Sequence, residues 1–163
     1  MRLKALSLLA AVSLLAACES APENGGAASS TSAVAPTTAT TNAVRPGSEQ
    51  DFVANVGDRV WFAYDKSVVT PEGRQILQKQ ADWLKKYPNV TVTVEGHCDE
   101  RGTREYNLAL GERRATAVKN VLVALGIPAN RMTTISYGKE RPAVVGSNEA
   151  AWAQNRRGVT VVN

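Results

Sequence analysis

The sequence contains few of the residues that build covalent cross-links, metal sites or large aromatic cores. Among its 163 residues are two cysteines, one histidine and 6% aromatic side chains. A structural zinc site needs about four protein ligands, mostly cysteine or histidine, so this composition argues against a zinc centre. Two cysteines allow at most one intramolecular disulfide, which excludes a small fold held together by several disulfides.

Motifs for two large enzyme classes are also absent. The chain has no G-x-S-x-G nucleophile elbow and no glycine-rich phosphate loop, which argues against an α/β-hydrolase and a P-loop nucleotide enzyme. The formal net charge of +4 counts Arg2 and Lys4 at the extreme N-terminus. The basic excess elsewhere is weak, so we predict no nucleic-acid partner. Nothing in the sequence indicates a cofactor.

Long apolar runs are absent except for one stretch near the N-terminus. Residues 5–17 (ALSLLAAVSLLAA) follow a short basic start and are too few to span a bilayer, but they fit the apolar region of a secretory signal peptide. The run ends in LAAC at 15–18, which resembles a bacterial lipobox. The resemblance implies a signal peptide at 1–17 and acylation of Cys18, whose acyl chains would anchor the protein without a transmembrane helix. The alternative is an ordinary signal peptide with a chance cysteine.

The next segment, residues 18–50, predicts a disordered tether. It is rich in Ala, Ser, Thr, Gly and Pro and has almost no large apolar side chains, so it cannot bury a core. As a flexible coil of ~32 residues it would span roughly 30 Å on average, and about 100 Å when fully extended. If Cys18 carries lipid, Cys98 has no disulfide partner within the chain.

Periodic apolar patterns occupy the remainder, so we predict a folded domain at 51–163. Alternating and β-branched stretches predict strands at 60–64, 90–95, 131–137 and 158–162. Helical spacing predicts helices at 70–87 and 103–125 and a short helix at 148–154, the first of them beginning with an N-cap at Thr70 and proline at 71. The main order, β-α-β-α-β-β, predicts an α+β sandwich with helices packed on one face of a small mixed sheet.

Residues 95–115 (EGHCDERGTREYNLALGERRA) place charges of both signs and the only histidine around a strand-to-helix turn. A metal site there is disfavoured, because neighbouring strand residues such as His97 and Cys98 point to opposite faces. We expect His97 to be a hydrogen-bonded residue at the strand end. Cys98 has the parity of the inward-facing valines, so it should pack as a small apolar residue rather than act as a nucleophile. We therefore predict no catalytic residue, no metal and no enzymatic activity.

Arg114 is the most informative residue of this stretch, because it interrupts the apolar stripe of the long helix. An arginine on an inward face is costly unless an anion meets it. Asp99 lies where the preceding strand ends, close to the first turns of the helix. Two interpretations remain open from the residues alone. Asp99 and Arg114 could form a salt bridge that joins helix to strand, or both could face one cleft and bind a ligand that carries both charges.

The same stretch resembles the signature of the OmpA-like peptidoglycan-binding domain family. The resemblance continues through VWFAYDKSVV before it and through SYGKERPAV and NRRGVTVV after it, and so covers roughly 51–163. The spacing of Asp99, Asn107 and Arg114 carries the match. A lipobox followed by a polar tether is the arrangement of the peptidoglycan-associated lipoproteins in that family.

The resemblance implies a non-enzymatic role: noncovalent binding of diaminopimelate in the peptide stems of peptidoglycan. Arg114 would bind the ligand carboxylate with two parallel hydrogen bonds. Asp99 would receive the ligand ammonium, and Asn107 would support the cleft from the helix. Tyr64 and Asp65 match a second contact region, in which backbone amides reach the ligand.

Location and partners follow from the same resemblance. It implies a lipid-anchored protein of the outer membrane whose domain faces the periplasm, and which works with TolB and other Tol proteins to support envelope integrity and outer-membrane constriction at division. Two departures from the family pattern stand at Ala63, where an acidic residue is common, and at Cys98, where Ala or Thr is more usual. A periplasmic enzyme acting on wall peptides and a module that binds mainly another protein are the alternative functions.

Overall fold

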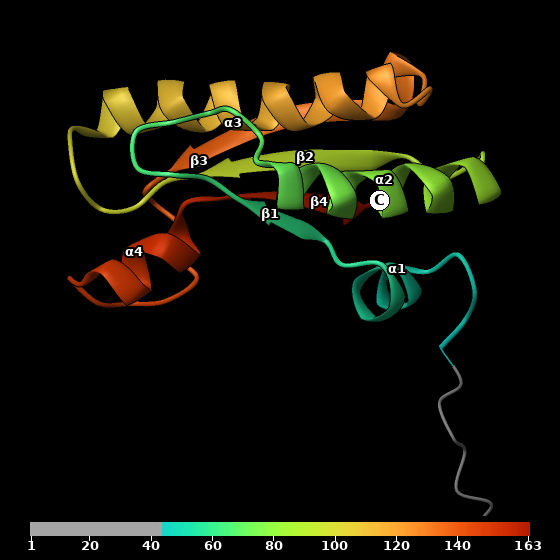
Figure 1. Ribbon diagram of the computed structural model, residues 1–163, viewed down its shortest axis with the longest axis horizontal. Coiled ribbons are helices and arrows are strands. Elements are labelled where there is room, and N and C mark those ends of the chain that lie inside the picture. The colour runs from blue at the N-terminus through green and yellow to red at the C-terminus, as the bar shows by residue number, and fades with distance from the viewer. Residues whose placement is uncertain (1–43) are drawn as a thin grey trace, which may run out of the picture. The chain divides into compact units, whose positions relative to one another are not determined.

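Figure 1 shows the computed structural model, which describes residues 44–163. The predicted signal peptide, Cys18 and most of the predicted tether lie outside the described residues. Within 44–163, no helix combines the length and apolar character needed to cross a bilayer.

The centre of the fold is a four-stranded sheet with the order β1-β4-β2-β3. Its strands are β1 (Arg59–Trp61), β2 (Val92–His97), β3 (Met132–Gly138) and β4 (Arg157–Val162). β2 and β3 are parallel, whereas β4 is antiparallel to both β1 and β2. The predicted α+β class with a small mixed sheet is therefore confirmed.

The first strand, β1, ends at Trp61 and is shorter than the predicted 60–64, because the chain turns away from the sheet after Phe62. The Phe62 amide still donates to the Arg156 carbonyl at 2.9 Å. A tight turn follows, in which the Lys66 amide donates to the Ala63 carbonyl and Asp65 adopts a left-handed φ of 54°. That turn carries residues 63–66 away from the sheet and toward the long helix α3 (Arg104–Ala124).

Two long helices, α2 (Pro71–Lys86) and α3 (Arg104–Ala124), begin where the sequence predicts them, α2 at the predicted N-cap Thr70. Thr70 and Thr103 accept hydrogen bonds from the amides of Gly73 and Tyr106, which satisfies donors that a helix start leaves unpaired. The short helix α4 (Glu149–Asn155) is also where the sequence predicts it, with Asn148 as its N-cap. A single 3-10 turn, Ala129–Arg131, precedes β3.

The helix α1 (Glu49–Asn55) is not predicted from the sequence. It is capped by Ser48 and begins two residues before the predicted boundary of the folded domain. Its Phe52 is fully buried and packs edge-on against Trp83, with ring centroids 4.9 Å apart. Trp83 Nε1 also donates to Asp51 Oδ2 at 2.9 Å. One aromatic anchor and one hydrogen bond therefore dock this helix on α2.

The hydrophobic core fills the space between the sheet and the helices. Val92 and Val94 of β2 point into it, while Thr93 and Glu95 face the opposite side of the sheet. Figure 1 shows α2 and α3 running alongside the strands and the short helices α1 and α4 near β1. The core is built mainly from Phe52, Val60, Phe62, Leu77, Leu84, Val92, Val94, Val118, Leu122, Ile127 and Met132.

Two glycines let α3 approach the sheet closely. A Cβ at Gly96 of β2 would overlap the carbonyl oxygen of Gly111, and a Cβ at Gly111 would overlap the Ser136 hydroxyl of β3. The Ser136 hydroxyl donates to the Leu108 carbonyl at 2.7 Å. Helix and sheet are thus in backbone contact at the end where β2 leads into α3, which fixes the first turns of α3 over the strand ends.

His97 lies on the sheet face opposite the core and is 1% exposed. Its ring stacks on Tyr137 with centroids 5.5 Å apart, and Nε2 lies 3.3 Å from Glu95 Oε2. Burial, together with the positive charges of Arg157 and Arg141, lowers the pKa of His97 to about 4. Burial also raises the pKa of Glu95. The predicted hydrogen-bonded histidine at the strand end is confirmed, as a buried neutral imidazole.

The docking of α1 predicts a large effect of Phe52→Ala on stability. Removing a fully buried aromatic ring should lower the free energy of unfolding by about 3–5 kcal/mol, measured by urea denaturation of the full chain. Val53→Ala in the same helix is the control, since Val53 is 45% exposed and should change stability by no more than about 0.5 kcal/mol. Similar small losses in both variants would show that α1 does not contribute to the core.

The buried histidine predicts a specific pH dependence. An ordinary imidazole in the unfolded chain takes up a proton near pH 6.5, whereas folded His97 resists protonation down to about 4. The folded state therefore binds fewer protons in this window, and falling pH removes roughly 3 kcal/mol of stability.

As the only histidine, His97 gives a single set of imidazole NMR resonances, and the midpoint of their titration with pH should lie near 4. The His97→Gln variant should lose the part of this pH dependence that His97 causes, and its stability should fall less between pH 6.5 and about 4 than that of the wild type. A midpoint near 6.5 in the wild-type protein would contradict the burial of this ring.

Candidate functional site

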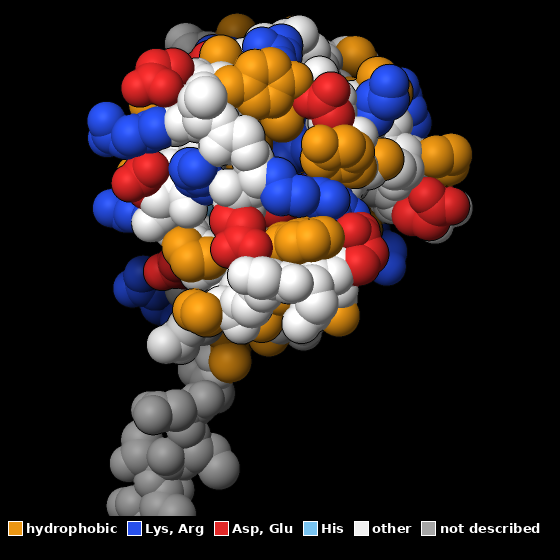
Figure 2. All heavy atoms as spheres, turned by 90° about the vertical axis from the view of Figure 1, so that its left-hand side faces the viewer, with side chains coloured by type: hydrophobic (Ala, Val, Ile, Leu, Met, Phe, Trp, Pro, Cys, Tyr) orange, Lys and Arg blue, Asp and Glu red, His pale blue; other side chains and the backbone are white. Residues whose placement is uncertain are grey.

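A polar pocket of about 170 Å³ opens at the end of the domain where β2 leads into α3. Tyr64 and Asp65 come from the β1–α2 loop, and Asp99 and Arg101 from the β2–α3 connection. α3 contributes residues four positions apart, Tyr106, Leu110 and Arg114, which lie on one helix face. Figure 2 shows this end of the molecule, where acidic, basic and hydrophobic side chains lie next to one another. The lining is Tyr64, Asp65, Cys98, Asp99, Arg101, Gly102, Tyr106, Asn107, Leu110 and Arg114.

Arg114 forms one wall of the pocket and is 1% exposed. Among residues 44–163, its guanidinium donates to backbone carbonyls alone: to Lys66 at 2.9 Å, to His97 at 2.8 Å and to Ala63 at 3.3 Å. Burial lowers the pKa of Arg114, but a guanidinium keeps its proton in proteins. Three carbonyl dipoles therefore fix the group in place without cancelling its positive charge.

Asp99 lies across the pocket from Arg114, and within residues 44–163 no hydrogen bond or ion pair joins the two. The simple Asp99–Arg114 salt bridge is therefore wrong. Asp99 is instead paired with Arg101, whose Nη2 lies 2.6 Å from Oδ2, and with Arg156 Nη1 at 3.4 Å. Burial would raise the pKa of Asp99, but the hydrogen bonds from Arg101 outweigh it and hold that pKa below its ordinary value.

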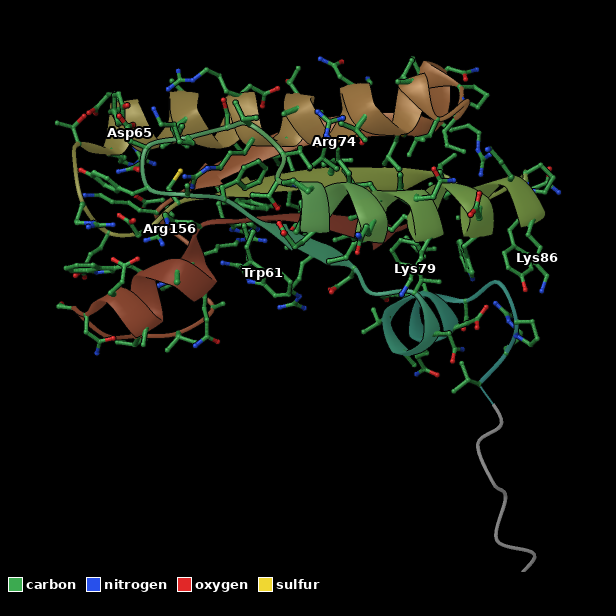
Figure 3. All side chains as sticks on the ribbon, viewed as in Figure 1. Trp61, Asp65, Arg74, Lys79, Lys86 and Arg156 are labelled. Carbon is green, nitrogen blue, oxygen red and sulfur yellow. The ribbon has the colours of Figure 1, made fainter. Side chains whose placement is uncertain are left out.

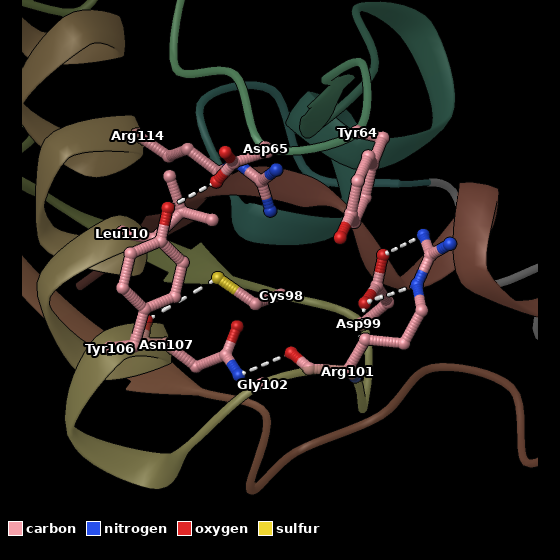
Figure 4. A pocket seen from close by; sticks show the side chains of 10 residues that line it. All are labelled: Tyr64, Asp65, Cys98, Asp99, Arg101, Gly102, Tyr106, Asn107, Leu110 and Arg114. Atoms are coloured by element: carbon pink, nitrogen blue, oxygen red, sulfur yellow. Dashed lines mark hydrogen bonds and ion pairs between the residues drawn. The ribbon is translucent and has the colours of Figure 1, made fainter.

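Arg101 is held between two aromatic rings. Its guanidinium carbon lies 4.1 Å from the ring centre of Tyr64 and 4.0 Å from that of Trp152 in α4. In Figure 4 the Tyr64 ring stands beside the Asp99–Arg101 pair. Trp152 in turn donates from Nε1 to Glu100 Oε1 at 3.0 Å. The loop before α3 is thereby connected to α4.

Arg156, just before β4, completes the charge network behind the pocket. It is 6% exposed and donates to the Phe62 carbonyl at 3.1 Å and to Glu149 Oε1 at 2.6 Å. Figure 3 shows Arg156 at the same end of the domain as Asp65. Arg101 and Arg156 therefore face Asp99 and Glu149, two cations against two anions.

The rim of the pocket is held by a contact between the β1–α2 loop and α3. The Tyr106 hydroxyl donates to Asp65, and this bond raises the pKa of Tyr106. Asn107, 2% exposed, donates to the Arg101 and Thr103 carbonyls at 2.8 and 3.0 Å and so ties the loop to the helix. The position expected for Asn107, on the helix and supporting the cleft, matches these contacts.

All five residues predicted as ligand contacts, Tyr64, Asp65, Asp99, Asn107 and Arg114, line this one pocket (Figure 4). Sequence reasoning missed Arg101, Tyr106, Trp152 and Arg156. Arg101 and Tyr106 belong to the quoted motif at 95–115, so the sequence alone could have identified them as candidates. Arg156 stands inside the quoted stretch NRRGVTVV, but only the pairing of β4 brings it to the site. Trp152 carries no local signal and reaches the site through the packing of α4.

Cys98 forms part of the pocket floor and is 2% exposed. Its thiol donates to the Asn107 carbonyl at 3.4 Å, and burial raises its pKa, so it remains a neutral thiol. The prediction that it packs as a small buried residue is confirmed. Within residues 44–163, no group of three potential His, Cys, Asp or Glu ligands could hold a metal ion.

Comparison with known proteins identifies the same family as the sequence motif. The OmpA family matches residues 61–156. The peptidoglycan-associated lipoprotein of Brucella melitensis is 57% identical over 121 residues, which cover 74% of this chain and 72% of that protein. The protein of the same name from Haemophilus influenzae is 42% identical, over 96% of this chain and 95% of its own length.

The fold agrees with that of a solved structure. The crystal structure of the peptidoglycan-associated lipoprotein from Burkholderia pseudomallei superimposes with a TM-score of 0.67 at 39% identity, covering 71% of this chain and all of that one. Proteins of this kind are structural and non-enzymatic, in line with the prediction from the sequence. The chain belongs to the OmpA family and, within it, to the peptidoglycan-associated lipoproteins.

Proposed function

We propose that the domain binds the diaminopimelate of peptidoglycan stems noncovalently in the pocket of Arg114 and Asp99. The single observation that supports this most directly is the state of Arg114. A buried cation normally stands against a carboxylate, yet this one donates only to carbonyls. A ligand carboxylate that reaches it would gain a charge-assisted hydrogen bond to a group already fixed in position.

The size and character of the pocket favour the end of an amino acid as the ligand. A volume of about 170 Å³ is well below the ~300–1,000 Å³ of pockets that enclose a drug-sized molecule. Only a terminal group can enter, and the lining offers it a cation on one side and a carboxylate on the other. The D-centre of diaminopimelate, with a free carboxylate and a free ammonium on one carbon, has this charge pattern.

We further propose that Cys18 is acylated and anchors the chain in the outer membrane, with the domain in the periplasm. The lipobox, the polar segment at 18–50 and the similarity to proteins named lipoproteins support this arrangement. Anchor and domain together would link the membrane to the wall as part of the Tol system, with TolB as a partner, and would support the envelope during constriction at division.

The wall-binding proposal predicts that Arg114→Ala weakens binding to sacculi rich in diaminopimelate. Loss of one side of a desolvated charge contact should cost about 2–5 kcal/mol of affinity, measured by cosedimentation of the full chain with purified sacculi. The soluble fraction should contain no new cleavage products, because the domain does not cut the wall.

Arg113→Ala is the matched control, since Arg113 is the exposed neighbour in α3 and does not line the pocket. Arg114 also holds three carbonyls, so melting temperatures must be compared. Asp99→Asn, which keeps the shape of the side chain, serves as a second variant. Unchanged wall affinity in both pocket variants, with a lower melting temperature alone, would show that Arg114 and Asp99 are purely structural.

The anchoring proposal predicts that Cys18→Ser separates location from binding. The variant should leave the membrane fraction, because it lacks the thiol that receives the lipid, but should still bind isolated sacculi like the wild type. Fractionation of cells followed by cosedimentation tests both points. Continued membrane retention of Cys18→Ser would refute lipidation at this residue.

A further inference from the structure

Arg101 occupies the position at which a ligand ammonium would have to arrive. A carboxylate offers about four lone-pair positions, and at Asp99 four donors already use them. Oδ1 accepts from the Arg101 amide and from Arg101 Nε, both at 3.1 Å. Oδ2 accepts from Arg101 Nη2 at 2.6 Å and from Arg156 Nη1 at 3.4 Å. An ammonium must therefore compete with Arg101 for Asp99.

The surroundings of Arg101 hold it on Asp99 and place a second carboxylate close by. Glu149 Oε2 lies 4.0 Å from Arg101 Nη2, and the 65% exposed Glu149 side chain is paired through Oε1 with Arg156. The Tyr64 and Trp152 rings form aromatic walls beside the guanidinium, whose carbon lies 4.1 and 4.0 Å from their centres. These cation–π contacts hold Arg101 where it pairs with Asp99, so a shift of Arg101 toward Glu149 weakens them. An ammonium that displaces Arg101 must therefore overcome the aromatic contacts as well as the ion pair.

We propose that Arg101 determines the selectivity of the pocket by acting as a displaceable counter-ion of Asp99. This inference rests on the proposed binding of diaminopimelate. While Arg101 remains on Asp99, the acidic half of the pocket is neutralised and discriminates poorly between ligands with and without an ammonium group. When an ammonium binds Asp99, Arg101 moves toward Glu149.

Two other roles for Arg101 lead to different expectations. If Arg101 bound a ligand carboxylate directly, its removal would weaken the binding of every carboxylate ligand. If Arg101 only joined the β2–α3 connection to α4 as a structural contact, its removal would change the binding of all ligands by a similar factor. Only a counter-ion that competes with the ammonium changes the preference for ammonium-bearing ligands over their ammonium-free counterparts.

The test compares two soluble probes, meso-diaminopimelate and pimelate, as competitors for binding of the full chain to sacculi. The probes share their carbon chain and both carboxylates and differ only in the two ammonium groups. In Arg101→Gln, uncovered Asp99 should attract the first probe and repel the second. The preference for diaminopimelate should rise roughly 5- to 30-fold, the equivalent of the two cation–π contacts and the partial neutralisation that Arg101 provides.

Arg104→Gln is the matched control, because it removes the same charge from an exposed residue whose ion pair with Glu140 (3.4 Å) lies outside the pocket. It should leave the preference unchanged. Trp152→Leu keeps every charge but removes one aromatic wall, so it should raise the preference in the same direction by a smaller factor. This variant carries the test if Arg101→Gln does not fold.

The outcomes separate this inference from the function on which it rests. If Arg114→Ala still lets both probes compete as in the wild type, the proposed function fails and the inference fails with it. If Arg114 is required but the preference is unchanged or lower in Arg101→Gln and Trp152→Leu, the counter-ion role alone is overturned. A higher preference for diaminopimelate in both variants, together with an unchanged preference in Arg104→Gln, establishes the counter-ion role of Arg101.

Discussion

The site depends on the way in which one buried guanidinium is held. Arg114 donates to carbonyls of Ala63, Lys66 and His97, which belong to the β1–α2 loop and to the end of β2. A carbonyl contributes a dipole rather than a full charge, so the three bonds compensate for the lost hydration of the guanidinium but leave its charge available. A carboxylate in the same place would have produced a stable salt bridge and an electrostatically neutral wall.

The close contact of α3 with the sheet makes this arrangement possible. Arg114 can reach the carbonyl of His97 only if the helix backbone lies very near β2, and Gly96 and Gly111 allow that approach. A Cβ at Gly96 would overlap the Gly111 carbonyl of α3, so a side chain there would push the helix away from β2 and strain the bond from Arg114 to the His97 carbonyl. The close packing of α3 on the sheet at these glycines therefore sets the position of the Arg114 guanidinium in the pocket.

Much of the fold and of the site could be predicted from the sequence, because these features depend on residues that lie close together along the chain. The cap at Thr70, the start of the long helix near Thr103, the alternation in β2 and the inward position of Arg114 each depend on residues a few places apart. The helix α1 escaped prediction because a seven-residue helix with one buried anchor, Phe52, shows no readable period. Arg156 was not assignable to the pocket, since it lies 57 residues from Asp99 and is brought there only by the pairing of β4. The choice of Asp99 between Arg101 and Arg114 depends likewise on three-dimensional packing, which keeps Arg114 occupied by carbonyls.

The proposed anchor changes what the pocket has to achieve. A site that admits only one terminal group of a ligand, and whose acidic residue is already paired, cannot gain much affinity from buried area. If the proposed anchor and the predicted tether keep the domain beside the wall, its effective concentration there is high, and a weak contact at each of many copies would hold the two layers together. Weak, polar contacts also exchange rapidly, which would let the proposed link release and rebind. A small, charged pocket whose acidic residue is already paired would suit the proposed link between membrane and wall, because tighter binding at one site would slow the release and rebinding of the wall.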